Sequence, residues 1–143
     1  MMLTPDYRDL LIRHLKAENA HQLAETLATL TEDCIFDDRT LGRVFRGREG
    51  AGRYYQMWWD AFGQTVQSER RHVPAPDQCI VEVRFQGRHI GPFLGLTPTG
   101  RSIDLPIAIF IDLKDGLMSG ERFYWDMATM LRQLGVGQLP ALG

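Results

Sequence analysis

The spacing of leucines predicts helices in the first thirty residues. Thr4 precedes a proline and an acidic residue, an order typical of a helix N-terminus. Leucines then recur at helical spacing, at Leu10, Leu11, Leu15, Leu23, Leu27 and Leu30. Asn19 with Gln22 three residues later resembles a capping box, which would restart the helix. We therefore expect two helices, or one broken helix, before the first strand.

A third helix is predicted from about Glu49 to Phe62, and it carries an aromatic stripe. Four aromatic residues fall at positions i, i+3, i+4 and i+7, namely Tyr55, Trp58, Trp59 and Phe62. A stripe of this kind usually packs into a core, but it also lines apolar pockets. The spacing alone does not separate these two interpretations.

Strands are predicted at Cys34–Asp37 and from Thr65 onward, where the hydrophobic period changes from helical to alternating. Gly42–Gly47 is expected to be an irregular connection. Within Val81–His89 the odd positions are mostly apolar, and the last of them is His89. The alternation therefore places His89 on the buried face.

The second half of the chain predicts an antiparallel meander. A turn at Thr97–Gly100 joins the preceding strand to Ser102–Leu113, and Asp115-Gly116 turns into the last strand. Ile103–Ile111 is apolar on both faces, as expected for a central strand or for one covered by a second subunit. We expect an α+β fold, with a curved and mostly antiparallel sheet wrapped around N-terminal helices, as one domain over residues 1–143 and as a homodimer.

Composition narrows the choice of partners. Sixteen basic and 18 acidic residues give a net charge of −2, which provides no pull toward nucleic acid or an anionic membrane. The N-terminus lacks a signal-peptide pattern, and the longest apolar run, Leu105–Ile111, is too short to span a bilayer. Cys34 and Cys79 are isolated and indicate thiols in a reducing compartment, although a disulfide stays open. We expect a cytoplasmic protein that binds a small apolar molecule.

Motifs for cofactors and metals are missing from the sequence. Gly47, Gly50 and Gly52 have G-x-x-G-x-G spacing, and no Gly-Lys-Ser/Thr follows, so a nucleotide loop is not indicated. The histidines lack the spacing of a metal site; they are His14, His21, His72 and His89. We therefore expect chemistry without a cofactor or a metal.

Asp126 is the residue that most needs an explanation. A carboxylate at the end of an aromatic strand is costly unless it is paired, hydrogen-bonded or protonated, and proton transfer requires a protonatable group. Asp126 also directly precedes the helix-like Met127–Leu134, with Gly135 as a stop signal, so helix capping explains it equally well. The two roles are compatible, because a capping carboxylate can still face a cavity.

Further polar candidates are Asp37 at the end of the first strand, His89 and Tyr124. His89 is either a buried histidine satisfied by the backbone or a catalytic group. On an unbroken last strand, one face carries Arg122, Tyr124 and Asp126, and the other carries Glu121, Phe123 and Trp125. A bulge would exchange the two faces.

Several separate pieces of the chain together resemble one family. They occur in the order Phe36-Asp37, Phe45–Glu49, Tyr54-Tyr55 with Trp58-Trp59, Gly87–Gly95, Pro98–Arg101 and Asp115–Gly135. This pattern resembles the SnoaL-like polyketide cyclases of the nuclear-transport-factor-two-like superfamily, over nearly the whole chain. The resemblance implies a cone-shaped sheet with a deep apolar pocket and a dimer formed through the sheet.

The resemblance also implies a reaction. In family members of known activity, the aspartate matching Asp126 is the acid/base of an intramolecular aldol ring closure without metal or cofactor. The family histidine that accompanies it would fall near Ala108, so His89 would have to substitute. A related branch, similar to limonene epoxide hydrolases, shares the Pro98–Arg101 turn but has a second carboxylate where this chain has Gly87–His89.

The resulting hypothesis is proton shuttling by Asp126 on a largely apolar carbonyl compound, by cyclisation or isomerisation, with His89 or Tyr124 as the hydrogen-bond donor to the developing enolate oxygen. The expected substrate contacts are Asp37, Tyr55, Trp59, Phe62 and Tyr124. The alternatives are a non-catalytic small-ligand-binding module of the same fold, and epoxide opening. An enzyme should have Asp126 facing a closed pocket, whereas a binding module can leave it as a solvent-facing cap.

Overall fold

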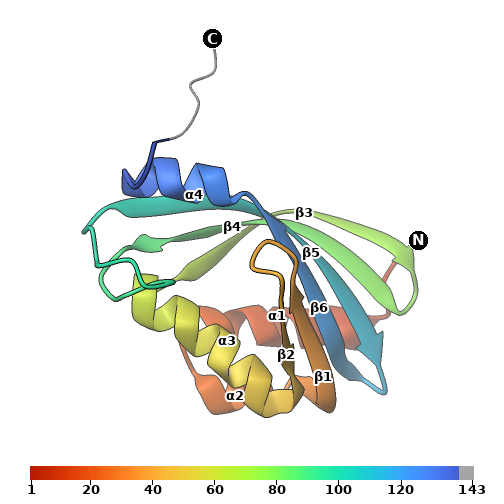
Figure 1. Ribbon diagram of the computed structural model, residues 1–143. Helices are drawn as coiled ribbons and strands as arrows, with labels where there is room; N and C mark the ends of the chain where they lie inside the picture. Colours follow the sequence, from red (N-terminus) through yellow and green to blue (C-terminus); the bar gives the residue numbers. More distant parts are fainter. Residues whose placement is uncertain (139–143) are drawn as a thin grey trace.

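A curved six-stranded sheet dominates the computed structural model, which describes residues 1–138 (Figure 1). The strand order is β2-β1-β6-β5-β4-β3. Their bounds are β1 (Leu30–Asp38), β2 (Arg43–Arg46), β3 (Thr65–Ala75), β4 (Gln78–Arg88), β5 (Ser102–Lys114) and β6 (Leu117–Trp125). All neighbouring pairs are antiparallel except β1 and β6, which run parallel. The predicted α+β fold with a mostly antiparallel sheet is confirmed.

The helices in the described chain are α1 (Pro5–Asn19), α2 (Leu23–Leu27), α3 (Gly47–Phe62) and α4 (Met127–Leu134). Thr4 caps α1, since its side-chain oxygen accepts a hydrogen bond from the Tyr7 amide at 3.2 Å. Helix α4 lies against β5, where the side-chain amide of Gln133 bonds to both backbone groups of Asp104, at 2.8 and 3.0 Å. Within residues 1–138, no helix has both the length and the apolar content that crossing a membrane requires.

Two local predictions were wrong. Gly42–Gly47 is not an irregular connection, because it contains β2, whose Phe45 pairs with Phe36 of β1. Leu30 is not part of a helical face either, because it begins β1 and is fully buried. In both places the element is too short to show a hydrophobic period, because β2 has four residues and α2 has five.

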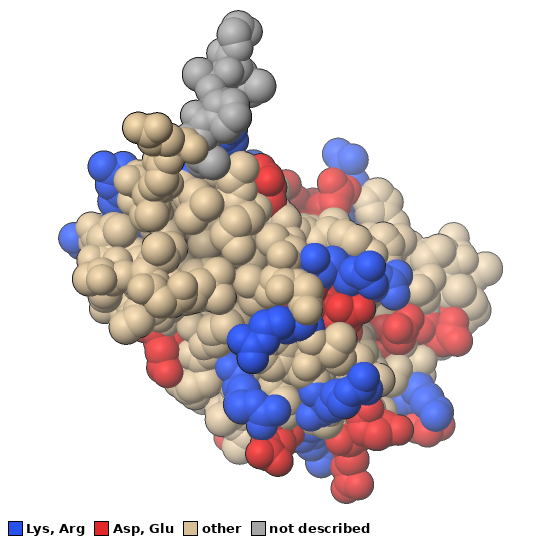
Figure 2. All heavy atoms as spheres, viewed as in Figure 1, with Lys and Arg blue, Asp and Glu red and all other residues tan. Residues whose placement is uncertain are grey.

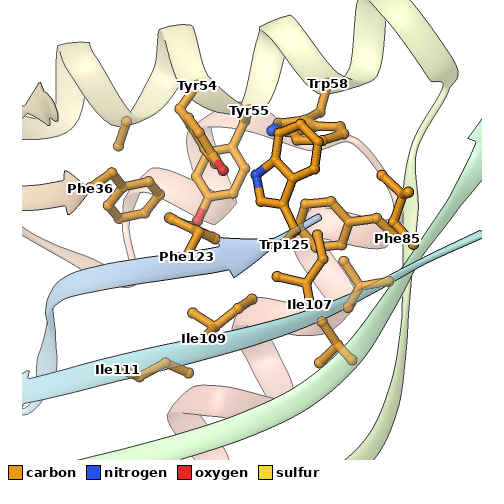
Figure 3. Packing of buried hydrophobic residues seen from close by; sticks show 14 of the residues in the cluster. Phe36, Tyr54, Tyr55, Trp58, Phe85, Ile107, Ile109, Ile111, Phe123 and Trp125 are labelled. Carbon is orange, nitrogen blue, oxygen red and sulfur yellow. The ribbon is translucent and has the colours of Figure 1, made fainter. Parts of the chain in front are cut away.

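The aromatic stripe of α3 packs against the concave side of the sheet. Tyr55, Trp59 and Phe62 are all at most 5% exposed. Figure 3 shows neighbouring aromatic residues of α3 directed at β6, and the Tyr54 ring lies 4.6 Å from that of Phe123. These edge and tilted ring contacts add to the burial of the aromatic area itself. They fix the helix against the sheet.

A buried carboxylate connects three of these elements at one end of the sheet. Asp38, the last residue of β1, is fully buried. It accepts hydrogen bonds from the Tyr54 hydroxyl at 2.7 Å, from the Trp125 indole at 3.0 Å and from the Leu41 amide at 2.8 Å. The donors satisfy both carboxylate oxygens, which is what keeps a buried carboxylate tolerable.

Charged side chains do not gather by sign on the face that Figure 2 shows. Basic and acidic groups are interspersed over part of this face, and the rest of it is largely uncharged. Such a surface lacks the broad single-sign field that steers large charged partners.

The two faces of β5 differ in their surroundings. Every second residue is buried on the concave side, namely Ile103, Leu105, Ile107, Ile109 and Ile111. On the outer side Phe110 is half-buried, and its ring meets that of Tyr124 edge-on at 5.5 Å. Tyr124 is 42% exposed. This aromatic pair on the outer face, with the Arg122 guanidinium 4.8 Å from the Phe110 ring, is where a second subunit could pack.

We expect the chain to form a homodimer through this outer face. Sedimentation velocity at micromolar concentration should give a dimer for the wild type and a monomer for Phe110→Glu, because the substitution removes the aromatic ring that packs against Tyr124 and places a charge in the interface. Ile12→Glu on α1 is the matched control, since Ile12 is 62% exposed away from the sheet. A monomeric wild type would refute the expectation.

Candidate functional site

A cavity lies between α1, α3 and the concave side of strands β3 to β6. Most of its wall is apolar and comes from α1, α3 and the sheet; Figure 3 shows Tyr55, Ile109 and Phe123 among the residues that line it. Its volume is about 70 Å³, several times the roughly 10–15 Å³ that one water molecule needs. The space therefore admits a small molecule.

Four buried polar side chains meet at the wall of this cavity. His14 and Glu18 are one turn apart on α1, Tyr55 comes from α3 and Glu121 from β6. His14 Nε2 lies 3.2 Å from Glu18 Oε1, 3.8 Å from Glu121 Oε1 and 3.2 Å from the Tyr55 hydroxyl. None of the four is more than 7% exposed. We refer to His14, Glu18, Tyr55 and Glu121 as the polar cluster.

The hydrogen bonds around His14 assign its tautomer. The Thr29 hydroxyl has one hydrogen, which it donates to the Thr26 carbonyl at 2.6 Å. It must therefore accept a hydrogen bond from His14 Nδ1, which lies 2.6 Å away. Since Nδ1 carries a hydrogen in either charge state, Nε2 is the nitrogen that gains and loses a proton. This nitrogen faces the two carboxylates.

Burial and neighbouring charges shift the pKa values of Glu121, His14 and Tyr55 in the polar cluster. Burial raises the pKa of Glu121 to about 8, and the charge of Glu18 adds to the rise while His14 opposes it. Burial alone would lower the pKa of His14, but the hydrogen bond to Glu18 and the charges of Glu121 and Glu18 outweigh it, so the pKa is raised. Burial also holds the pKa of Tyr55 well above 10, so its hydroxyl stays protonated. A buried carboxyl that titrates near neutral pH can exchange protons.

Gln64 adds an unused acceptor to the cavity wall. Its amide NH₂ donates to Glu18 Oε2 at 3.4 Å, which assigns the amide orientation because a carboxylate only accepts. Its Oε1 is buried and has no hydrogen-bond partner among residues 1–138. A buried carbonyl oxygen without a donor is unfavourable. A ligand with an O–H or N–H group would satisfy it.

Of the residues predicted for the site, Asp126 and Tyr124 do not line the cavity. Asp126 is exposed and caps α4, accepting hydrogen bonds from the Thr129 amide at 3.2 Å and hydroxyl at 2.6 Å. The hydrogen bonds from Thr129 hold the pKa of Asp126 below its ordinary value. Tyr124 lies on the outer face of the sheet beside Phe110. Asp126 is therefore placed as a cap that remains charged.

His89 is buried as expected, but it too lies outside the cavity lining. Its Nδ1 accepts a hydrogen bond from the Thr99 amide at 3.1 Å, which leaves the hydrogen on Nε2. Nε2 has no hydrogen-bond partner in the described part of the chain. The His89 ring packs 5.2 Å from that of Phe62. His89 therefore supports the loop after β4.

The remaining residues that were predicted to contact the substrate lie in different places. Tyr55 lines the cavity, whereas Trp59 stacks behind it at 5.6 Å and is not part of the lining. Asp37 is half-buried and accepts a hydrogen bond from Arg39 at 3.4 Å. Because side chains alternate along a strand, Asp37 faces away from the buried Asp38 beside it. Among all the predicted site residues, only Tyr55 reaches the cavity wall.

Sequence reasoning missed the other members of the polar cluster, although signals for them exist. His14 and Glu18 are four residues apart, and His14 follows Leu10 and Leu11 on the buried side of α1. Glu121 alternates with Phe123 and Trp125 on the last strand, and the structure buries that face. A carboxylate on the apolar side of an amphipathic strand is the pattern that could have identified it.

Comparison with known proteins gives one family and one fold. The family model of SnoaL-like polyketide cyclases matches residues 8–134. No curated protein matches the chain. Similar solved structures include a protein described as a SnoaL-like polyketide cyclase from Jannaschia sp. CCS1, with a TM-score of 0.84 at 21% identity, covering 96% of this chain and 99% of that one.

Two further structures are similar. TsrD from Streptomyces laurentii has a TM-score of 0.80 at 22% identity, covering 94% of this chain and 98% of that one. A protein of Catenulispora acidiphila with a ketosteroid isomerase-like fold, solved with trimethylamine, has a TM-score of 0.77 at 16% identity, covering 96% and 99%. At these identities the similarity establishes the fold.

The raised pKa of Glu121 predicts a specific pH dependence of stability. Between its ordinary value of 4.5 and about 8, the folded chain holds a proton that the unfolded chain has released. Stability should therefore fall as pH rises through this window, by at most about 1.4 kcal/mol per pH unit. His14 contributes with the same sign, because its folded pKa is also raised.

Thermal unfolding at a series of pH values checks this prediction. Glu121→Gln should flatten the decline, whereas Glu82→Gln should not, because Glu82 is on the surface and hydrogen bonding from His72 lowers its pKa. An equal slope in Glu121→Gln and wild type would contradict the raised pKa.

The role of Asp126 as a cap predicts a second stability result. Asp126→Ala should lower the unfolding midpoint, while Asp126→Asn should stay close to wild type, because Asn is an equally good N-cap. Thr4→Ala, which removes the cap of α1, provides a reference for the size of a lost cap. If the urea unfolding midpoint of Asp126→Asn is as low as that of Asp126→Ala, then Asp126 stabilises the fold through its charge and not through capping.

Proposed function

This chain belongs to the SnoaL-like polyketide cyclase family, and on that premise we propose that it is a cofactor-free acid/base catalyst acting on a small carbonyl compound. The observation that carries the proposal is Glu121, a buried carboxyl with a pKa of about 8 at the wall of an apolar cavity. A general base works best when its pKa lies near the working pH. Glu121 takes the role that sequence reasoning gave to Asp126.

The polar cluster suggests how a proton would move. The Glu121 carboxylate takes a proton from the carbon next to a substrate carbonyl, and the electron pair of the broken C–H bond passes to the carbonyl oxygen as an enolate. With His14 protonated, its Nε2–H bonds to Glu18, which leaves the Tyr55 hydroxyl hydrogen free for the enolate oxygen. The substrate thereby gains a donor where negative charge develops.

Two outcomes follow from the enolate. In an aldol ring closure its carbon attacks a second carbonyl of the same molecule, a C–C bond forms, and Glu121 returns the proton to the new alkoxide oxygen. In an isomerisation Glu121 returns the proton to a different carbon. Both outcomes balance without an oxidant or a metal. The cavity of about 70 Å³ favours a small substrate over a polycyclic one.

The competing function is a non-catalytic binding module. It is favoured by the position of Asp126, because a solvent-facing cap there is what a binding module allows. In that case the polar cluster would only orient a bound ligand, and its pKa values would follow from burial alone.

Deuterium exchange into acetonylacetone, a neutral diketone able to close a ring by aldol condensation, tests the proposal. Wild-type protein in D₂O should speed exchange next to the carbonyls, as followed by proton NMR, and Glu121→Gln should lower the rate about a hundredfold or more. Tyr55→Phe should lower it less, because one oxyanion donor is lost.

Asp126→Asn is the matched control, since it also replaces one carboxyl by an amide near the end of β6. It should exchange at the wild-type rate. Loss of exchange in Asp126→Asn with retention in Glu121→Gln would return the acid/base role to Asp126. Binding without any exchange would favour the binding module.

A further inference from the structure

The mouth of the cavity carries a cation whose position depends on a β-bulge. Along β3 the register shifts between Ser68 and Arg70, so Glu69 is an extra residue. In an unbroken strand, Ser68 and Arg71 would face opposite sides, because they are three residues apart. After the bulge both line the cavity. Bulges re-aim side chains in this way, often beside functional sites.

Arg71 also differs from the neighbouring arginines in its partners. Arg70 lies 3.8 Å from Glu82, and Arg84 lies 3.2 Å from Asp104, both in surface ion pairs. Within residues 1–138, none of the side-chain hydrogen bonds or ion pairs involves the Arg71 guanidinium, and the side chain is exposed. A guanidinium presents paired donors that match a carboxylate. At the mouth of this cavity those donors are unused.

The interior of the cavity does not repel an anion. When His14 is protonated, its charge offsets that of Glu18, which it contacts at 3.2 Å. Glu121, whose pKa burial raises to about 8, is mostly protonated at neutral pH, and only its deprotonated fraction acts as the base. The polar cluster is then close to neutral as a whole. The positive charge of Arg71 at the mouth is therefore the main electrostatic interaction for a small molecule that approaches the cavity.

We propose that the substrate carries a carboxylate, which Arg71 binds at the mouth while the reacting carbonyl reaches the polar cluster. The inference rests on the proposed function, because it takes the cavity as the substrate site. It adds a specificity-determining residue and narrows the substrate class to a small oxo acid. The bulge at Glu69 is what places Arg71 for this contact.

A matched pair of probes tests the inference by binding alone. Levulinate and acetonylacetone share one skeleton, and they differ in that the first ends in a carboxylate and the second in a methyl ketone. Calorimetric titration should show wild-type protein binding levulinate about tenfold more tightly, with a preference that weakens in high salt. Arg71→Gln should remove the preference and leave acetonylacetone binding unchanged.

Arg70→Gln is the control, because it removes the same charge from the adjacent residue, which pairs with Glu82 on the surface. It should keep the levulinate preference. Equal binding of the two probes by wild type, no binding of either, or an equal loss in Arg70→Gln and Arg71→Gln would overturn the inference. A preference that depends on Arg71 without deuterium exchange would support it while refuting catalysis.

Discussion

The buried carboxylate of Asp38 is the constraint on which the arrangement of the site depends. It ends β1 and accepts hydrogen bonds from Tyr54 on α3 and Trp125 at the end of β6. A hydrogen bond to a carboxylate typically contributes about 1.5–3 kcal/mol, so these three elements are held together strongly. Tyr55, the next residue of α3, then has a fixed approach to the cavity. The carboxylate that fixes the fold is thus distinct from the carboxyl that we propose for chemistry.

Alternation along β6 assigns different tasks to adjacent residues. Glu121 and Phe123 face the cavity, Trp125 reaches Asp38, and Tyr124 faces outward beside Phe110. A shift of one residue in the register of β6 would exchange its two faces. The outward-facing side chains of β6, which include Tyr124, would then point into the core. The register of β6 against β5 is therefore a requirement of the site as well as of the fold.

The sequence predicted the long elements well because their periods are long enough to recognise. The aromatic face of α3 and the strand Ser102–Lys114 are examples. It did not predict β2, which has too few residues to show a period. It placed the chemistry at Asp126, because capping and catalysis give the same local pattern there. His14 and Glu121 are 107 residues apart, and only tertiary structure shows that both reach one cavity wall.

The parallel pairing of β1 with β6 bears on the order in which the molecule assembles. Its strands are separated by most of the chain, whereas β3 to β6 follow one another as neighbours in the sheet. Closing a long loop costs more entropy than closing a short one, and such distant pairings slow folding. The meander of β3 to β6 can form first, while its concave side is still exposed to water. In that order of assembly, Glu121 would lose its water only when α1 and α3 close over the meander, so the step that completes the fold would also be the one that raises its pKa.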